Sequence, residues 1–146
     1  MLDIKFLEKE YLKFGEKNGI DDTILKKIED TLKISLPSDF KQISKFFSGG
    51  DLGAIYNYDF EPGEWDNIVG ETIKLRSLVR LPKNFVVLAE PPESIILMDV
   101  INNPTIIWCD ALDIYNIKNK KCMNKPYLWD NYSDFFYELI LDEQNI

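Results

Sequence analysis

Three short apolar runs, separated by short turn-forming segments, constrain the fold of this chain more than any other feature. They cover residues 85–89, 94–99 and 105–109 and are rich in Val, Ile and Leu, which favour β-strands. The connections contain Pro91-Pro92 and Asn103-Pro104, and their shortness suits antiparallel neighbours. The sequence therefore predicts a meander of adjacent, buried antiparallel strands.

Apolar residues recur at helical spacing before and after these runs, between charged residues. Aspartate and asparagine suit helix starts, proline suits a first turn, and glycine suits a helix end. The predicted helices are residues 2–18, stopped by Gly19; 21–32, capped by Asp21 or Asp22; 37–48, begun by Pro37 and ended by Gly49-Gly50; 65–78; and a last helix capped by Asn131.

Two further short strands are predicted, at residues 55–58 and 113–117, the second from its alternating pattern. The chain has 146 residues, a size typical of one domain with its own hydrophobic core. We therefore expect residues 1–146 to form a single α+β domain, with a central, largely antiparallel sheet and N-terminal helices and a C-terminal helix packed around it.

The composition excludes several classes of function. The sequence contains no histidine, which removes Ser-His-Asp and Cys-His catalysis and most zinc sites. Its formal net charge of −8 disfavours nucleic acid and favours a basic partner. Cys109 and Cys122 lack the spacing of a metal site or disulfide framework, and Cys109 is expected to be a buried structural thiol. We expect no cofactor and no metal ion.

Neither a signal sequence nor a membrane-spanning segment is predicted. The first residues lack a basic region followed by an apolar one, and no apolar stretch approaches the roughly 18 residues that a span requires. The sequence therefore predicts a cytoplasmic protein that does not enter a membrane.

One segment combines acidic and aromatic residues and contains no Lys or Arg between Lys45 and Lys74. Aromatic side chains anchor protein interfaces, and complementary charge speeds association and selects partners. If residues 55–59 form a strand, Tyr56 and Tyr58 share one face, opposite Ile55, Asn57 and Asp59. The predicted partner-binding residues are Asp51, Tyr56, Tyr58, Asp59, Glu61, Glu64, Trp65 and Asp66.

Other roles for these residues stay open. The aromatic residues could belong to the core, with the acids as a solvated rim around them. Glu61, Glu64, Asp66 and Glu71 could supply the acid and base of a small carbohydrate enzyme, which would require a deep pocket. Asp51, Asp59 and Glu61 could bind a metal, although their spacing matches no calcium loop. Glu90 and Glu93 could form a second acidic lip on a loop.

The order and spacing of several short motifs resemble the SMI1/KNR4 family of the SUKH superfamily. The resemblance covers most of the chain, and no single motif would be specific. The motifs are Leu36-Pro37-Ser38-Asp39-Phe40, Phe47-Ser48-Gly49-Gly50, Leu81-Pro82, Ile96-Leu97-Met98-Asp99, Trp108-Cys109-Asp110 and Tyr132-Ser133-Asp134-Phe135-Phe136.

This resemblance implies an α+β fold and a role without enzymatic chemistry. Bacterial members of the family typically neutralise polymorphic toxins, many of them nucleases, whereas yeast relatives are regulators linked to cell-wall synthesis. Because no long disordered extension accompanies this domain, we expect an immunity protein that binds a cognate, basic toxin. A regulatory adaptor of the same fold is the alternative, and the sequence leaves the oligomeric state open.

Overall fold

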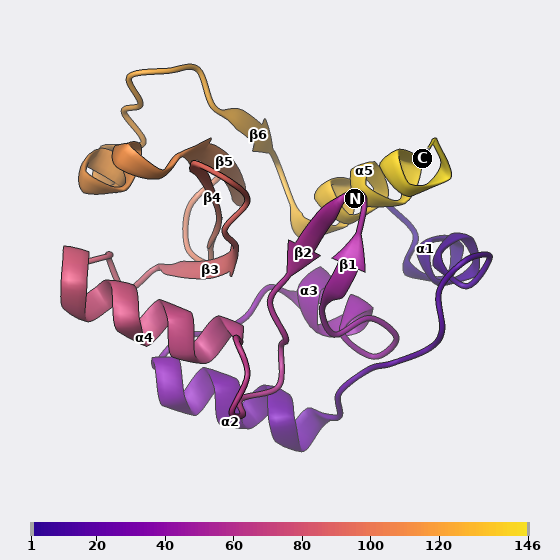
Figure 1. Cartoon of the computed structure of the whole chain (residues 1–146). Coiled ribbons are helices and arrows are strands. Elements are labelled where there is room, and N and C mark those ends of the chain that lie inside the picture. The colour runs from indigo at the N-terminus through magenta and orange to yellow at the C-terminus, as the bar shows by residue number, and fades with distance from the viewer. Residues whose placement is uncertain (1, 146) are drawn as a thin grey trace.

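A computed structural model describes residues 2–145 and confirms the α+β fold, with helices packed on an antiparallel sheet (Figure 1). The helices are α1 (Ile4–Tyr11), α2 (Asp22–Leu32), α3 (Ser38–Ile43), α4 (Ile68–Val79), the 3-10 helix η1 (Ala111–Asn119) and α5 (Tyr132–Gln144). The strands are β1 (Gly50–Leu52), β2 (Ile55–Asn57), β3 (Phe85–Ala89), β4 (Ser94–Asp99), β5 (Ile106–Asp110) and β6 (Tyr127–Trp129).

The predicted meander forms the centre of the molecule. Its strand order is β3-β4-β5-β6, with every neighbouring pair antiparallel, while β1 and β2 form a separate antiparallel hairpin. Side chains alternate between the two faces of the sheet. Val86 and Ile96 join the large core on one face, and Val87 and Leu97 join a smaller core on the other. Both faces are therefore buried, which explains the nearly continuous apolar runs.

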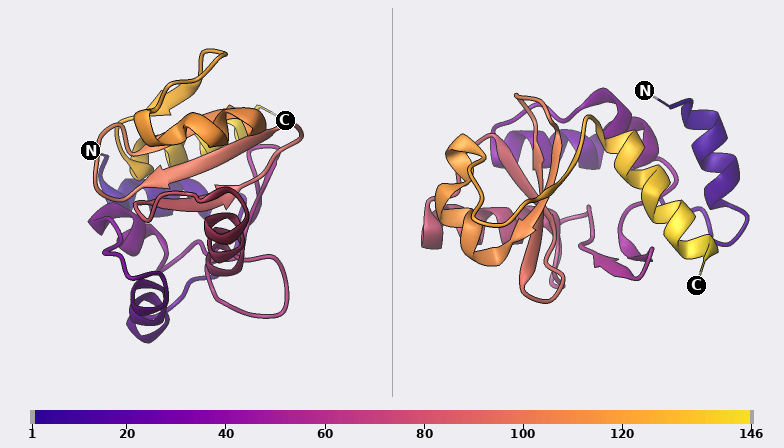
Figure 2. Two further views of the ribbon diagram at one scale, coloured as in Figure 1. Left: turned by 90° about the vertical axis from the view of Figure 1, so that its left-hand side faces the viewer. Right: turned by 90° about the horizontal axis from the view of Figure 1, so that it is seen from above.

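Different elements cover the two faces. The larger core contains residues of α1, α2, α3, α5 and the hairpin, and the smaller core contains residues of η1. Seen from above, α1 and α5 lie side by side at one end of the molecule, with the sheet and η1 at the other (Figure 2). The sheet thus joins two cores, and both are largely made of residues that recur at helical or strand spacing.

The β3 edge of the sheet is covered by α4 and by the end of the hairpin. The backbone N–H of Val87 donates to the Thr72 hydroxyl of α4 at 2.9 Å. The backbone N–H of Tyr58 donates to the carbonyl of Leu88 at 3.0 Å. These contacts satisfy backbone groups that an open edge would expose, and they place the acidic and aromatic segment directly beside the end of β3.

The first helix is shorter than predicted, and Gly19 has a different role from a helix stop. Helix α1 ends at Tyr11, and the chain then runs extended beside the end of α3. The N–H of Asn18 donates to the Phe46 carbonyl at 3.0 Å, and that of Ile20 to the Ser44 carbonyl at 2.8 Å. Between these bonds, a Cβ on Gly19 would lie 2.0 Å from the Lys45 carbonyl oxygen. Glycine is therefore required by close backbone approach.

Replacing Gly19 by alanine is expected to destabilise the protein by about 1–3 kcal/mol, because the backbone of the turn after α3 must move to admit the methyl group. Gly63→Ala is a matched control, since a Cβ there meets no atom within 4 Å. Urea unfolding should show a lower midpoint for Gly19→Ala and at most a small change for Gly63→Ala. Equal midpoints for Gly19→Ala and the wild type would contradict this explanation.

Three other sequence predictions were wrong. Residues 113–117 belong to η1 instead of a strand, because Ile114 and Ile117 recur three apart and both face the core. The third helix ends at Ile43, so Gly49-Gly50 does not cap it. Instead, both glycines have positive φ and start the hairpin, with Gly49 against the backbone of Tyr58.

The third wrong prediction is the start of the helix that was expected at residues 65–78. That helix begins at Ile68, because Asn67 caps it by accepting a hydrogen bond from the Gly70 N–H at 2.7 Å. The predicted caps of α2 and α5 are confirmed, since Asp21 accepts from the Ile24 N–H and Asn131 from the Asp134 N–H.

Candidate functional site

The acidic and aromatic segment folds into the β1–β2 hairpin and a loop that leads to α4. The predicted alternation along β2 is confirmed: Ile55 and Asn57 are buried, while Tyr56 is 47% exposed between them. Tyr58 is half-buried, and its ring meets that of Tyr56 edge-on with the centroids 6.1 Å apart. Tyr56 therefore presents an aromatic ring to solvent, and the half-buried ring of Tyr58 packs against it.

Phe60 belongs to the core and does not contribute to this surface. It is 1% exposed, and its ring packs against Phe40 and Phe47 with centroid distances of 4.7 and 5.8 Å. The core interpretation of the aromatic residues therefore holds for Phe60 but not for Tyr56.

Trp65 is the most exposed aromatic side chain of the segment, at 78%. Its backbone position is fixed by Asn67, whose side-chain amide donates to the Trp65 carbonyl at 2.9 Å and to the Gly63 carbonyl at 3.2 Å. The loop is thus held by a helix cap while the indole projects into solvent. Tryptophan is one of the residues that most often dominate binding energy at the centre of an interface.

The fold brings together acids that are far apart in sequence. Asp51, Asp59 and Asp66 are close enough to Tyr56 to raise the pKa of its hydroxyl, after the larger effect of burial. Burial raises the pKa of Tyr58, and the next contribution comes from Glu90 at the end of β3. The sequence suggested that Glu90 and Glu93 form a separate acidic loop. In the structure, the contact between β2 and β3 brings Glu90 close to the acids around Tyr56 and Tyr58.

The carboxyl groups of Glu90 and Glu71 interact directly. Partial burial, a hydrogen bond to Glu71 and the negative charge of Glu71 together raise the pKa of Glu90 to about 7, from an ordinary value of 4.5. Lys74 opposes this shift and pairs with Glu71 at 3.7 Å. We define the acidic-aromatic surface as Asp51, Tyr56, Tyr58, Asp59, Trp65, Asp66, Glu71 and Glu90.

Two predicted site residues lie at the margin of this surface. Glu61 and Glu64 are exposed on the loop that precedes Trp65, and neither makes a hydrogen bond or ion pair with another described residue. Sequence reasoning found them because they are neighbours in the chain. It missed the pairing of Glu71 with Glu90, because that pairing depends on how α4 lies along β3.

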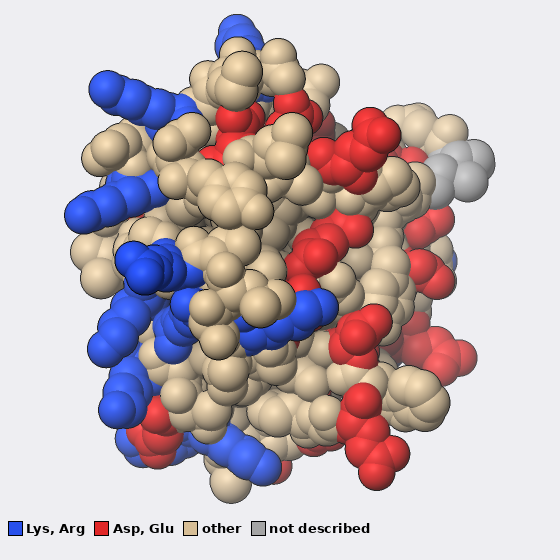
Figure 3. All heavy atoms as spheres, turned by 60° about the vertical axis from the view of Figure 1, so that its left-hand side comes forward, with Lys and Arg blue, Asp and Glu red and all other residues tan. Residues whose placement is uncertain are grey.

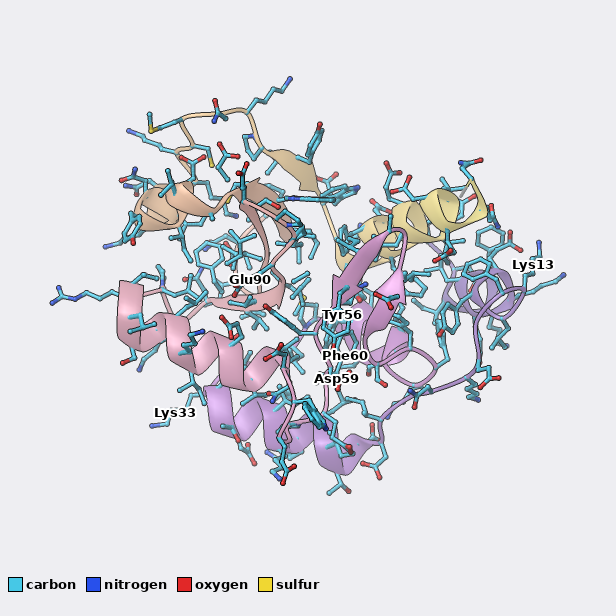
Figure 4. The ribbon with its side chains drawn as sticks, in the orientation of Figure 1. Lys13, Lys33, Tyr56, Asp59, Phe60 and Glu90 are labelled. Atoms are coloured by element: carbon cyan, nitrogen blue, oxygen red, sulfur yellow. The ribbon has the colours of Figure 1, made fainter. Side chains whose placement is uncertain are left out.

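Basic side chains are nearly absent from the acidic-aromatic surface. Residues 46–73 and 84–117 contain no Lys or Arg, and the surface is built from these two stretches. In Figure 4 Tyr56, Asp59 and Glu90 lie near one another at the centre, whereas Lys13 and Lys33 lie at opposite margins. On the face in Figure 3 the Lys and Arg side chains gather on one side and the Asp and Glu side chains on the other.

Replacing Glu90 by glutamine is expected to stabilise the protein at alkaline pH but not at acid pH. Below about pH 4.5 the carboxyl is protonated in both folded and unfolded chains. Between about pH 4.5 and pH 7 the unfolded chain ionises this carboxyl while the folded chain keeps its proton because its pKa is raised, so the wild type loses stability over this range and the loss is complete above pH 7. Because the residue is exposed, the gain at pH 8 should not exceed about 1 kcal/mol.

Urea unfolding at pH 4 and pH 8 measures this difference. Glu93→Gln, on the turn that follows, is the matched control, because it removes one carboxylate and leaves the Glu71–Glu90 contact intact. A Glu90→Gln midpoint equal to that of the wild type at both pH values would show that the Glu71–Glu90 interaction does not persist in solution.

The enzyme and metal alternatives gain no support from the geometry. Five hollows in the described part of the chain are lined by other segments, and none is lined by Glu61, Glu64, Asp66 or Glu71. Within residues 2–145, no group of three or more Cys, Asp or Glu side chains is arranged to hold a metal ion. None of these five hollows is therefore a site formed by the four acids.

Cys109 is a buried residue of the smaller core, as predicted, and burial raises the pKa of its thiol to about 12. Cys122 packs against the same core, and both cysteines are free. A thiol that is buried and protonated at neutral pH is a poor nucleophile.

The helices between residues 2 and 145 include none that is long and apolar enough to span a membrane. No curated protein is similar enough in sequence to count as a match. A family profile described as SMI1-KNR4 cell-wall matches residues 4–140, which is nearly the whole chain. The chain therefore belongs to the SUKH_5 group of the SMI1-KNR4 family.

Proposed function

We propose that this chain is a cytoplasmic immunity protein, a single binding domain that neutralises a basic toxin through the acidic-aromatic surface. Proteins of this family are often immunity proteins and are generally non-catalytic. The observation that carries the proposal is the exposure of Tyr56 and Trp65 among carboxylates drawn from two separate parts of the chain.

The aromatic residues supply the apolar part of such an interface. The backbone at both anchors is held in place, by the hairpin at Tyr56 and by Asn67 at Trp65, so little backbone freedom remains to be lost on binding. Tyrosine and tryptophan are the residues most often found to dominate binding energy when they enter a pocket on a partner. We expect these two side chains to be the anchors.

The acidic residues define the kind of partner. Asp51, Asp59 and Asp66 produce a local negative field with few cations to cancel it, and Glu90 adds to it as it ionises near pH 7. A nuclease exposes Lys and Arg to hold phosphate groups, and a carboxylate surface can pair with the same side chains. Binding there would block access of nucleic acid to the toxin, which needs no catalysis and no cofactor.

Co-expression with the product of the adjacent gene tests the proposal. Cells that make the neighbouring protein alone should die, whereas cells that also make this chain should survive and yield a complex of the two at a fixed ratio. A harmless neighbour that forms no complex would contradict the immunity role and make a regulatory adaptor of the same fold the better account.

A further inference from the structure

A second exposed surface lies on η1, away from the acidic-aromatic surface. Residues three apart stack on one side of a 3-10 helix. Ile114 and Ile117 face the smaller core and are buried. Leu112 and Tyr115 are 78% and 68% exposed, and Lys118 continues the same spacing and is also exposed. This helix therefore presents a stripe of two apolar side chains and one cation to solvent.

The segment after η1 is held beside this stripe. The backbone N–H of Met123 donates to the buried Asp113 carboxylate at 2.9 Å, while the Met123 side chain is 87% exposed. Cys122, next to it, packs against the smaller core. A hollow of about 280 Å³ is lined by Asn116, Asn119, Lys121, Cys122 and Met123. The stripe, the methionine and the hollow are therefore neighbours.

This surface carries a local excess of positive charge. Between residues 111 and 129 the only acid is Asp113, and it is 2% exposed. Asp110, just before η1, is half-buried and accepts a hydrogen bond from the side-chain amide of Asn124. Lys118, Lys121 and Lys125 are all exposed, and Lys120 pairs with Asp99 at 2.9 Å. Three exposed cations outnumber these two acids and attract a negatively charged partner, although the whole chain carries a net charge of −8.

We infer that this second surface binds an acidic segment of another protein, with carboxylates on the lysines and an apolar side chain in the hollow. The η1 surface is defined as Leu112, Tyr115, Lys118, Lys121, Met123 and Lys125. Its flexible, apolar Met and Leu side chains suit an apolar side chain of a peptide. A polyphosphate chain is disfavoured, because it has no apolar group to cover the exposed side chains of Leu112, Tyr115 and Met123.

The inference goes beyond the proposed function and does not depend on it. In Figure 1 the orange ribbon of η1 lies at the upper left, whereas the β1–β2 hairpin lies near the centre, so the two surfaces are built on different parts of the molecule. The chain could hold a basic partner and an acidic partner together. An immunity protein with both surfaces could contact two parts of one toxin, or a toxin and a second protein.

Selection from a displayed library of random twelve-residue peptides, with the purified full chain as bait, tests this inference. Peptides enriched by the wild type should have a net negative charge and contain at least one Leu, Phe or Trp. Titration of an enriched peptide should shift the amide resonances of residues 112–125. The triple variant K118E/K121E/K125E should weaken binding at least tenfold, whereas K9E/K13E/K17E on and after α1 is the control and should not.

Three results would overturn the inference. The first is a set of enriched peptides with no acidic bias, and the second is an enriched peptide that binds the K118E/K121E/K125E variant as tightly as the wild type. The third is tighter binding of a single-stranded oligothymidine, with the same dependence on the three lysines, which would assign the surface to nucleic acid. None of these results would affect the toxin rescue experiment, so failure here is distinguishable from failure of the proposed function.

Discussion

Changing Asp59, Asp66 and Glu90 together to lysine is expected to weaken binding of the basic partner by a factor of at least about 1,000, or about 4 kcal/mol. Each change removes an attraction and adds a repulsion, and like charges brought together at an interface cost several kcal/mol. Glu90 is included because the fold, not the sequence order, places it beside Glu71 and near enough to Asp66 for their charges to interact. Calorimetric titration of the partner into each variant measures the loss.

A second triple variant controls for the overall change of charge. Glu16, Glu138 and Asp142 are exposed acids after α1 and on α5, so their replacement by lysine changes the net charge equally. This control should slow association slightly and change affinity by no more than a few fold. Circular dichroism must show that both variants are folded. Equal losses in the two variants would mean that the partner senses only total charge, which would contradict a defined site.

Replacing Asp39 by alanine is expected to destabilise the fold by about 3 kcal/mol. Asp39 is 2% exposed, and its two carboxylate oxygens accept hydrogen bonds from the N–H of Phe40 at 2.9 Å and of Ser133 at 2.8 Å. Ser133 is in the first turn of α5, where a negative charge also interacts favourably with the helix dipole. Removing the carboxylate leaves buried donors unpaired.

Asp134→Ala is the matched control for this prediction. Asp134 lies in the same first turn of α5 but is only partly buried, and its side chain is not a partner of α3. We expect it to cost less than about 1 kcal/mol. Urea unfolding of both variants gives the comparison. A loss for Asp39→Ala no larger than that for Asp134→Ala would show that this link between α3 and α5 contributes little.

The sequence predicted the parts of the fold that depend on local patterns. The runs that became β3 and β4 match the predicted strands residue for residue, because both faces of the sheet are buried and the apolar pattern is continuous. Helix α2 and its cap were also predicted, since its buried stripe and Asp21 are all local features. These elements owe their identity to residues within a few positions of each other.

The elements that were missed or misplaced depend on contacts across the chain. Strand β6 contains no fully buried residue and is defined by pairing with β5. The N-terminal helix was predicted too long because the apolar spacing continues to Phe14, although Gly19 must lie against α3. Strand β1 was missed because Gly50 begins it, and glycine normally weakens a strand.

The candidate site was likewise predicted where local sequence patterns define it and missed where contacts across the chain define it. Alternation along the chain predicted that Tyr56 lies opposite Ile55 and Asn57, which the structure confirms. The sequence pattern did not predict that Glu71 and Glu90 form a pair, because they lie in different elements and no short motif contains both. Charge composition was more useful than any motif here, since two long stretches without Lys or Arg became one surface.

The most direct test is a hydrogen-exchange comparison of the free chain with its complex with the product of the adjacent gene. The proposed interface predicts that protection appears in residues 51–66 and around Glu90, with Trp65 showing a blue shift in fluorescence as it leaves water. Protection confined to α1 and α5, with residues 51–66 exchanging as fast as in the free chain, would contradict the acidic-aromatic surface as the binding site.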